Sequence, residues 1–303
     1  MQVTRTLGIQ VGEELLPLIS SSWLPRGARP SQAELPAVVE VLRESGATPQ
    51  VPGDPTLRLG TVRLWVPGDP APALLKGESG SFGVLELARH RARLVLRGES
   101  SPAIATDLYS MLTIASALLL GRLGEALIHS AAMVSPDGQG WLLTGDSHSG
   151  KSTTCASLIS RGWNYLSDDQ VVLRREGDGV VAEGLLRPFH LDEGWGGTDP
   201  IQRRKTVDSA SIGRGKQLAS ATLGRLLFPA VSPGEPTSLT RIPAADSLAR
   251  LVRQSPWLLA DGAAAAGGLE LLRSTARLPS FAVSLGLDTF RDPELLARTL
   301  LHS

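Results

Sequence analysis

Cysteine is almost absent from this sequence, since its 303 residues contain only Cys155. One thiol cannot form an internal disulfide, and it cannot supply the several cysteines of a structural zinc site. Such low cysteine usage is typical of a reducing compartment. Residues 1–12 also lack the basic segment followed by an apolar segment that marks an export signal. We therefore expect a cytoplasmic protein.

An excess of one charge and a long apolar run are absent as well. Thirty basic and thirty acidic residues cancel, so the basic footprint of a nucleic-acid-binding protein is lacking. The most apolar segment, within residues 101–125, is interrupted by polar residues such as Asp107 and Ser110. It is shorter than the roughly 18 uninterrupted apolar residues that a membrane-spanning helix needs. We expect a buried helix there, no nucleic-acid partner and no membrane association.

Length and composition predict two domains, because 303 residues with 42% hydrophobic content can bury more than one core. Residues 1–100 are rich in proline and glycine and contain alternating segments at 57–66 and 91–98, which are typical of short antiparallel strands. We predict a small β-rich domain over 1–100, a candidate for substrate recognition. Within it, residues 14–25 are predicted as a strand and residues 36–46 as a short helix.

Residues 101–303 are predicted to form an α/β domain that begins with the long helix after Ser101. Two strands at 127–134 and 140–145 are joined by a hairpin, and a helix follows until about residue 161. A strand at 163–167 and a hairpin turned at 177–179 come next. Further helices are predicted at 244–253 and 292–301.

The pattern G-x-x-x-x-G-K-[ST] occurs once, after an apolar strand and before an amphipathic helix, which is the context it requires. Its residues are Gly145, Asp146, Ser147, His148, Ser149, Gly150, Lys151 and Ser152. Glycines let the backbone turn so that N–H groups point at anionic oxygens beside a helix N-terminus. Lys151 is predicted to bind the β- and γ-phosphates of a nucleotide, Ser152 to bind Mg²⁺, and Thr153 to bond a phosphate.

Two aspartates, Asp168 and Asp169, follow only 17 residues after Lys151. If the strand at 163–167 lies beside the strand at 142–144, a right-handed crossover brings its carboxyl end next to the phosphate loop. Neighbouring side chains on a strand point to opposite sides, so one aspartate is predicted to hold the metal and the other to meet the nucleophile. His129, on the preceding strand, is a candidate partner for an aspartate if the hairpin register is favourable.

Over residues 127–190 the sequence "IHSAAMV…GWLLTGDSHSGKSTTCASLISRGWNYLSDDQVVL" resembles the catalytic core of the HPr kinase/phosphorylase superfamily. The resemblance implies a P-loop core of the type shared by HPr kinase and phosphoenolpyruvate carboxykinase, with ATP and Mg²⁺ as cofactors. It implies that Asp168 is the base toward a seryl hydroxyl, that Asp169 lies near the metal, and that His129 and Lys151 are catalytic. It is also compatible with a homo-oligomer, because members of that family often form rings.

The sequence departs from the bifunctional members of that family, because "AEGLLRPFHL" stands where they carry an E-[IV]-R-G motif. We therefore do not expect phosphorylase activity, and the chain looks more like divergent HPr-kinase-like proteins, some of which phosphorylate a serine of a ribosomally made peptide. Arg187 and Lys205 are candidate phosphate or substrate contacts, although surface ion pairs explain them equally well.

Three functions other than a peptide or protein serine kinase have to be compared with the sequence. A kinase of a small hydroxylated metabolite, such as free serine, needs the same residues. A regulatory module that binds ATP without transferring phosphate needs the loop but not the paired carboxylates, which repel a γ-phosphate. A carboxykinase-like decarboxylating enzyme is not expected, because the sequence offers no histidine and lysine pair for a second metal.

Overall fold

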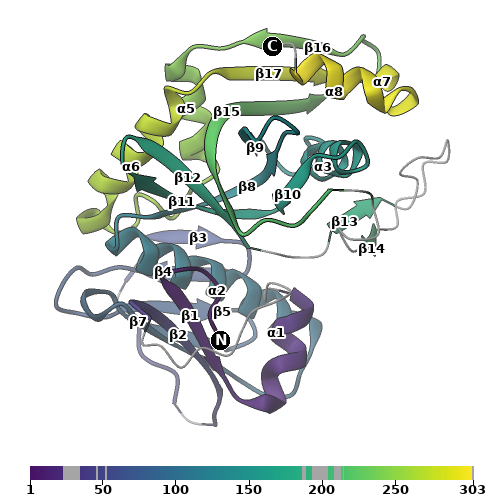
Figure 1. Cartoon of the computed structure of the whole chain (residues 1–303). Helices are drawn as coiled ribbons and strands as arrows, with labels where there is room; N and C mark the ends of the chain where they lie inside the picture. Colours follow the sequence, from purple (N-terminus) through teal and green to yellow (C-terminus); the bar gives the residue numbers. More distant parts are fainter. Residues whose placement is uncertain are drawn as a thin grey trace. The chain divides into compact units, whose positions relative to one another are not determined.

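The computed structural model of the chain describes residues 1–22, 35–45, 47–51, 53–185, 189–192, 204–207, 213 and 215–301. The chain is mixed α/β and divides into two compact units, each with a large sheet (Figure 1). The first unit comprises Met1–Leu127 with Pro256–Leu269, and the second comprises Ile128–Ser255 with Glu270–Ser303.

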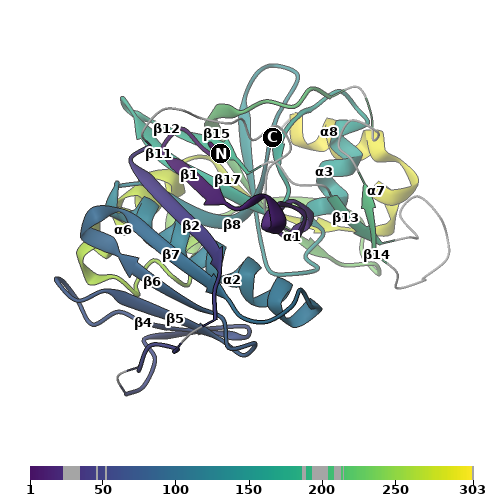
Figure 2. The same cartoon turned by 90° about the horizontal axis from the view of Figure 1, so that it is seen from below.

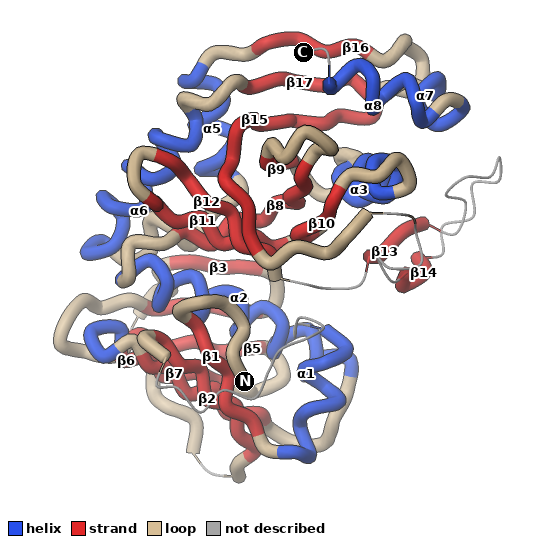
Figure 3. The backbone as a smooth tube through the Cα atoms, viewed as in Figure 1, coloured by secondary structure: helices blue, strands red, loops and turns tan. Residues whose placement is uncertain are grey.

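The first unit contains a seven-stranded sheet in the order β1-β2-β7-β6-β5-β4-β3 (Figure 3). Its strands are β1 (Leu7–Val11), β2 (Ala37–Arg43), β3 (Leu57–Leu59), β4 (Val62–Trp65), β5 (Ala73–Gly77), β6 (Phe82–Glu86) and β7 (Arg91–Leu96). The predicted alternating segments at 57–66 and 91–98 do form strands, and β3 pairs with β4 as an antiparallel hairpin. In contrast, β2 pairs in parallel with both β1 and β7.

Two predictions within this unit were wrong, in opposite senses. Residues 14–25 were predicted as a strand, but residues 14–22 lie in the short helices η1 (Glu13–Leu15) and α1 (Leu16–Ser22), and residues 23–25 lie outside the described part of the chain. Residues 36–46 were predicted as a helix, but they contain β2. Every second residue of this segment is fully buried, namely Ala37, Val39 and Val41, and this period of two is that of a strand with one face in the core. The β-branched valines also favour a strand over a helix.

Helix α2 (Pro102–Arg122) packs against this sheet (Figure 2), contacting β2 and β7. It begins at Ser101, whose side-chain oxygen accepts a hydrogen bond from the backbone N–H of Ile104. Within the described residues it is the one helix long and apolar enough to cross a membrane, but 72% of that apolar window is buried in the fold. It is therefore a core helix. It lies within the first unit, whereas the predicted domain boundary at residue 100 grouped it with the second domain.

The second unit is built on an eight-stranded sheet in the order β10-β8-β11-β12-β15-β17-β16, with β9 paired to both β8 and β15. Its strands are β8 (Ala126–Val134), β9 (Gly140–Thr144), β10 (Asn164–Ser167), β11 (Gln170–Glu176), β12 (Gly179–Gly184), β15 (Ser220–Val231), β16 (Ser238–Arg241) and β17 (Ser280–Leu285). A separate pair joins β13 (Phe189–Asp192) to β14 (Arg204–Val207). The helices of this unit are α3 (Lys151–Ile159), α5 (Ala244–Arg253), α7 (Leu287–Arg291) and α8 (Pro293–Leu301), and α6 (Gly262–Ala276) begins in the first unit and ends in the second.

The predicted hairpins and the helices at 244–253 and 292–301 are confirmed, but the predicted strand neighbour of β9 is wrong. Strand β10 does not lie beside β9, because β8 lies between them and is antiparallel to both. The strands β9 and β10 therefore run in the same direction, and their carboxyl ends lie at the same edge of the sheet. The register fixes that edge, since Ser130 of β8 pairs with Thr144 and Ala132 pairs with Ser167.

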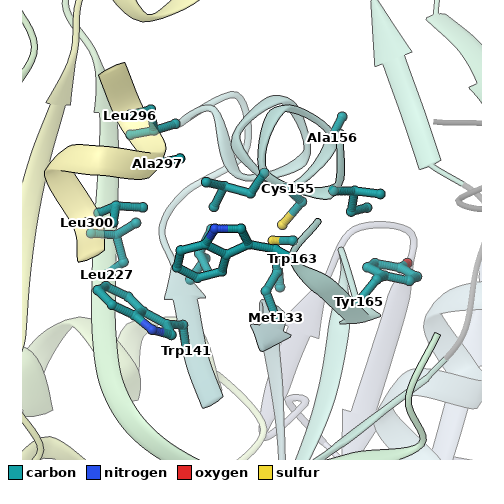
Figure 4. Packing of buried hydrophobic residues seen from close by; sticks show 14 of the residues in the cluster. Met133, Trp141, Cys155, Ala156, Trp163, Tyr165, Leu227, Leu296, Ala297 and Leu300 are labelled. Atoms are coloured by element: carbon teal, nitrogen blue, oxygen red, sulfur yellow. The ribbon is translucent and has the colours of Figure 1, made fainter. Parts of the chain in front are cut away.

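A hydrophobic core between the sheet and helices α3 and α8 holds this edge in place (Figure 4). Trp141 of β9 and Trp163 meet edge to face, with ring centroids 5.5 Å apart and an interplanar angle of 65°. The thiol of Cys155, on the inner face of α3, is fully buried in the same cluster. The packing therefore fixes the start of α3 against the end of β9.

Shortening one core side chain of α3 is expected to destabilise the second unit. Leu158 is fully buried in this cluster, so Leu158→Ala should lower the free energy of unfolding by about 3 kcal/mol, through lost burial and the cavity left behind. Urea unfolding followed by tryptophan fluorescence measures this change. The control Leu287→Ala, at a leucine that is 46% exposed, should change it by less than about 0.5 kcal/mol. Equal effects would contradict the assigned core.

Candidate phosphate-binding and catalytic site

Residues 145–150 connect the end of β9 to the start of α3, and together with the first two residues of that helix they are called the 145–152 loop. His148 has φ = 64° and Gly150 has φ = 97°, so left-handed residues interrupt the turn. Left-handed residues within a turn direct successive backbone N–H groups into one concavity, which suits an anion. A Cβ atom at Gly150 would lie 2.8 Å from the Cδ1 atom of Leu285. Glycine is therefore required there on both conformational and steric grounds.

Lys151 lies at the first position of α3 with its side chain folded back over the loop. Its Nζ atom donates to the backbone carbonyl oxygens of Gly145 at 2.7 Å and Asp146 at 3.0 Å. Burial lowers the pKa of this ammonium group, and the charges of Asp169 and Asp168 partly offset that shift. The ammonium group is thus held over the loop, within electrostatic range of both carboxylates.

His129 and Asp169 form a pair at the same edge of the sheet. The Nδ1 atom of His129 lies 3.1 Å from Oδ1 of Asp169, and both side chains are partly exposed. The hairpin register explains this position, because Ser130 pairs with Thr144 and His129 therefore lies level with the start of the loop. The favourable register that the sequence left open is the one observed.

Asp168 lies in different surroundings from its neighbour. It is 5% exposed, and the hydroxyl of Tyr165 donates to its Oδ1 atom at 3.3 Å. Burial and the charge of Asp168 together raise the pKa of Tyr165 well above its ordinary value, so this phenol stays protonated as a donor. Burial and the negative charge of Asp168 also raise the pKa of the Cys155 thiol. The two aspartates thus occupy one buried and one accessible position, which suits different tasks.

Comparisons with known proteins add little to this geometry. No protein-family model matches the sequence, and no curated protein matches it either. Among solved structures, the Hpr(Ser) kinase/phosphatase from Coxiella burnetii is similar to this chain with a TM-score of 0.35 and 13% sequence identity. The similarity covers 58% of this chain and 94% of that chain. It is a distant likeness in fold and does not bear on the chemistry of the site.

The end of helix α5 also reaches this edge, which sequence reasoning missed. Asp146 accepts hydrogen bonds from Nη2 of Arg253 at 2.6 Å and from Nε2 of Gln254 at 2.7 Å. These partners lie 107 and 108 residues further along the chain. A motif search covers only neighbouring residues, so no local signal in the sequence could have found them.

The remaining predicted residues differ in exposure, and two of them are described only in part or not at all. Ser147 and His148 are exposed in the loop, while Ser152 and Thr153 are half-buried in the first turn of α3. Lys205 lies on β14, where it pairs with Leu191 of β13, and β13 contacts α3. The position of the Lys205 side chain and the whole of Arg187 lie outside the described part of the chain.

Ser152 and Asp169 carry hydroxyl and carboxylate oxygens, which are the ligands that Mg²⁺ prefers. Their residue types therefore fit a hard divalent cation that would be shared with a phosphate group. Among the described residues, no cluster of three or more histidine, cysteine, aspartate or glutamate side chains could hold a metal alone. Mg²⁺ in nucleotide sites usually takes one or two protein ligands, with phosphate oxygens and water completing its shell.

Proposed function

We propose that the protein is an HPr-kinase-like phosphotransferase that moves the γ-phosphate of ATP to a serine hydroxyl of a peptide or protein. The observation that carries this proposal is that the carboxyl ends of β9, which leads to Lys151, and of β10, which is followed by Asp168 and the His129-bonded Asp169, lie at one sheet edge. A module that only binds nucleotide has no use for two carboxylates near the ammonium group, because they repel a γ-phosphate.

The 145–152 loop would bind the donor. Its backbone N–H groups and the N-terminus of α3 would surround the phosphates, and Lys151 would neutralise the β- and γ-oxygens. Ser149 supports this assignment, because its Oγ atom is buried and has no hydrogen-bond partner among the described residues. Bound Mg²⁺, held by Ser152 and Asp169, would supply further neutralisation of the phosphate charge.

Asp168 would orient the acceptor hydroxyl and take its proton as the seryl oxygen bonds to phosphorus and the bond from phosphorus to the departing diphosphate breaks. Phosphoryl transfer passes through a loose transition state, in which positioning matters more than base strength. Tyr165 donates to one oxygen of Asp168, and this bond would help to fix the orientation of the carboxylate. His129 would fix the rotamer of Asp169 and keep that carboxylate directed at the metal.

Mass spectrometry tests the proposal directly. The full chain is incubated with ATP, Mg²⁺ and serine-containing peptides, including peptides encoded beside its gene. A gain of one phosphate on serine is the expected result. Phosphorylation of free serine without any peptide would instead identify a metabolite kinase. Tight ATP binding without transfer to any acceptor would identify a regulatory module, and both outcomes would overturn the proposal.

His129→Leu should lower kcat by about 10- to 100-fold, because leucine fills part of the space of the imidazole ring but has no nitrogen to bond Asp169, and mispositioned metal ligands cost about this much. The Kd for ATP, measured by calorimetry without Mg²⁺, should change by less than about threefold. His90→Asn is the control at a histidine of the first unit, where φ = 53° is a conformation that asparagine tolerates. An unchanged kcat in His129→Leu would rule out the positioning role.

A further inference from the structure

Gln254 contacts the two halves of the proposed site at once. Its side-chain Nε2 atom donates to Oδ1 of Asp146 in the 145–152 loop at 2.7 Å. Its backbone carbonyl oxygen accepts a hydrogen bond from the backbone N–H of His129 at 3.0 Å. One residue therefore joins the loop that would bind phosphate to the strand position that carries the His129–Asp169 pair.

The helix that presents Gln254 is itself fixed to the sheet. Leu251 of α5 is fully buried, and the guanidinium group of Arg250 lies 5.3 Å from the ring centroid of Phe228 on β15. Strand β15 pairs in parallel with β9, the strand that leads into the loop. The end of α5 is thus anchored to the sheet by packing.

Of the two partners of Asp146, Gln254 is the stronger candidate for holding the loop. The ion pair with Arg253 joins side chains that are 63% and 67% exposed, and exposed ion pairs contribute little. Gln254 is 8% exposed, so packing holds its amide in place and its bond to the carboxylate is less open to water than the ion pair. A carboxylate only accepts, so the amide must present its N–H group there.

We propose that Gln254 is a positioning residue that sets the 145–152 loop against His129, so that bound phosphates and the paired side chains are aligned. This inference rests on the proposed function. Its physical basis is a continuous chain of contacts, because the backbone oxygen of Asp146 accepts from Lys151 while its side chain is held by Gln254. Releasing Asp146 would free the carbonyl that orients the lysine ammonium group.

The test exchanges donor and acceptor between the two residues. Gln254→Glu brings two carboxylates to hydrogen-bonding distance, and it should weaken the binding of ATP with Mg²⁺ about tenfold or more and lower kcat. When Asp146→Asn is added to Gln254→Glu, the asparagine amide at 146 can donate to the new carboxylate at 254. The double variant should then bind within about threefold of Asp146→Asn alone, which is the coupling that a double-mutant cycle measures.

Gln254→Met is a second variant, because it keeps the approximate length of the side chain and removes the amide that donates to Asp146. It should raise KM for ATP and lower kcat while the thermal unfolding midpoint stays within about 2 °C. If both variants lower the unfolding midpoint and leave ATP binding unchanged, or if the double variant shows no coupling, the inference is wrong. A wild-type chain that does not bind ATP would instead overturn the proposed function, so the two failures are distinguishable.

Discussion

Lys151→Met is expected to lower kcat/KM for ATP by about 10³-fold. Methionine keeps the buried aliphatic stem of Lys151 but removes the ammonium group that bonds the carbonyl oxygens of Gly145 and Asp146. A fixed cation aimed at developing phosphate charge contributes on this order in phosphotransferases. Steady-state kinetics with the phosphorylated peptide as product measures the effect, and calorimetry with ATP shows how much of it is lost binding.

Lys216→Met is the matched control, since Lys216 is an exposed lysine of the same unit. It should leave kcat/KM within about twofold of the wild type. If Lys151→Met keeps most of its activity, the 145–152 loop is not the donor site and the assignment of its residues fails.

Asp168→Asn is expected to lower kcat by about 10³-fold, within the range that a positioned general base contributes. Asparagine keeps the shape of the side chain and still accepts a hydrogen bond from Tyr165, but it cannot take a proton from the acceptor hydroxyl. The Kd for ATP should stay within about threefold. Single-turnover measurements with saturating peptide separate the chemical step from product release.

Asp178→Asn, in the exposed turn between β11 and β12, is the control for this substitution and should have no effect on kcat beyond about twofold. Asp169→Asn should instead raise the Mg²⁺ concentration needed for half-maximal activity. Equal loss of ATP binding and turnover in Asp168→Asn would undo its role, and an exchange of the two results would make Asp169 the proton acceptor.

The sequence predicted the parts of the site that depend on local patterns. The motif around Lys151 predicted a turn between a strand and a helix, and β9 and α3 are found there. The hairpin 127–145 also followed from its turn, and its register brings His129 to the start of the loop. Turn chemistry and hydrophobic periodicity act over a few residues, so a single sequence carries them well.

Strand order is a non-local property, and there the prediction was wrong. The short connection from α3 to residue 163 suggested that β10 pairs with β9, but β8 takes that place because it pairs with both. The carboxyl ends still coincide, since two antiparallel pairings restore a parallel direction. The contacts of Asp146 with Arg253 and Gln254 were beyond prediction for the same reason, as they form only once α5 has packed.

The swapped assignment of residues 14–25 and 36–46 has a more local cause. Glu40 and Arg43 lie among apolar residues of β2 at spacings that also fit a helix. The alternation of Val39 and Val41 decides the outcome, because β2 gains a hydrogen-bonded neighbour on each side. Short apolar segments remain ambiguous until such partners are known.

The burial of the lone sulfhydryl, that of Cys155, has a practical consequence. It is fully enclosed, and burial raises its pKa, so little reactive thiolate is available to alkylating reagents or mild oxidants. The unmodified protein is therefore expected to take up little thiol-reactive label. Two cysteines introduced at exposed positions would alone take up spin labels or fluorophores, and the distance between them on adding ATP could then be followed without altering the interior.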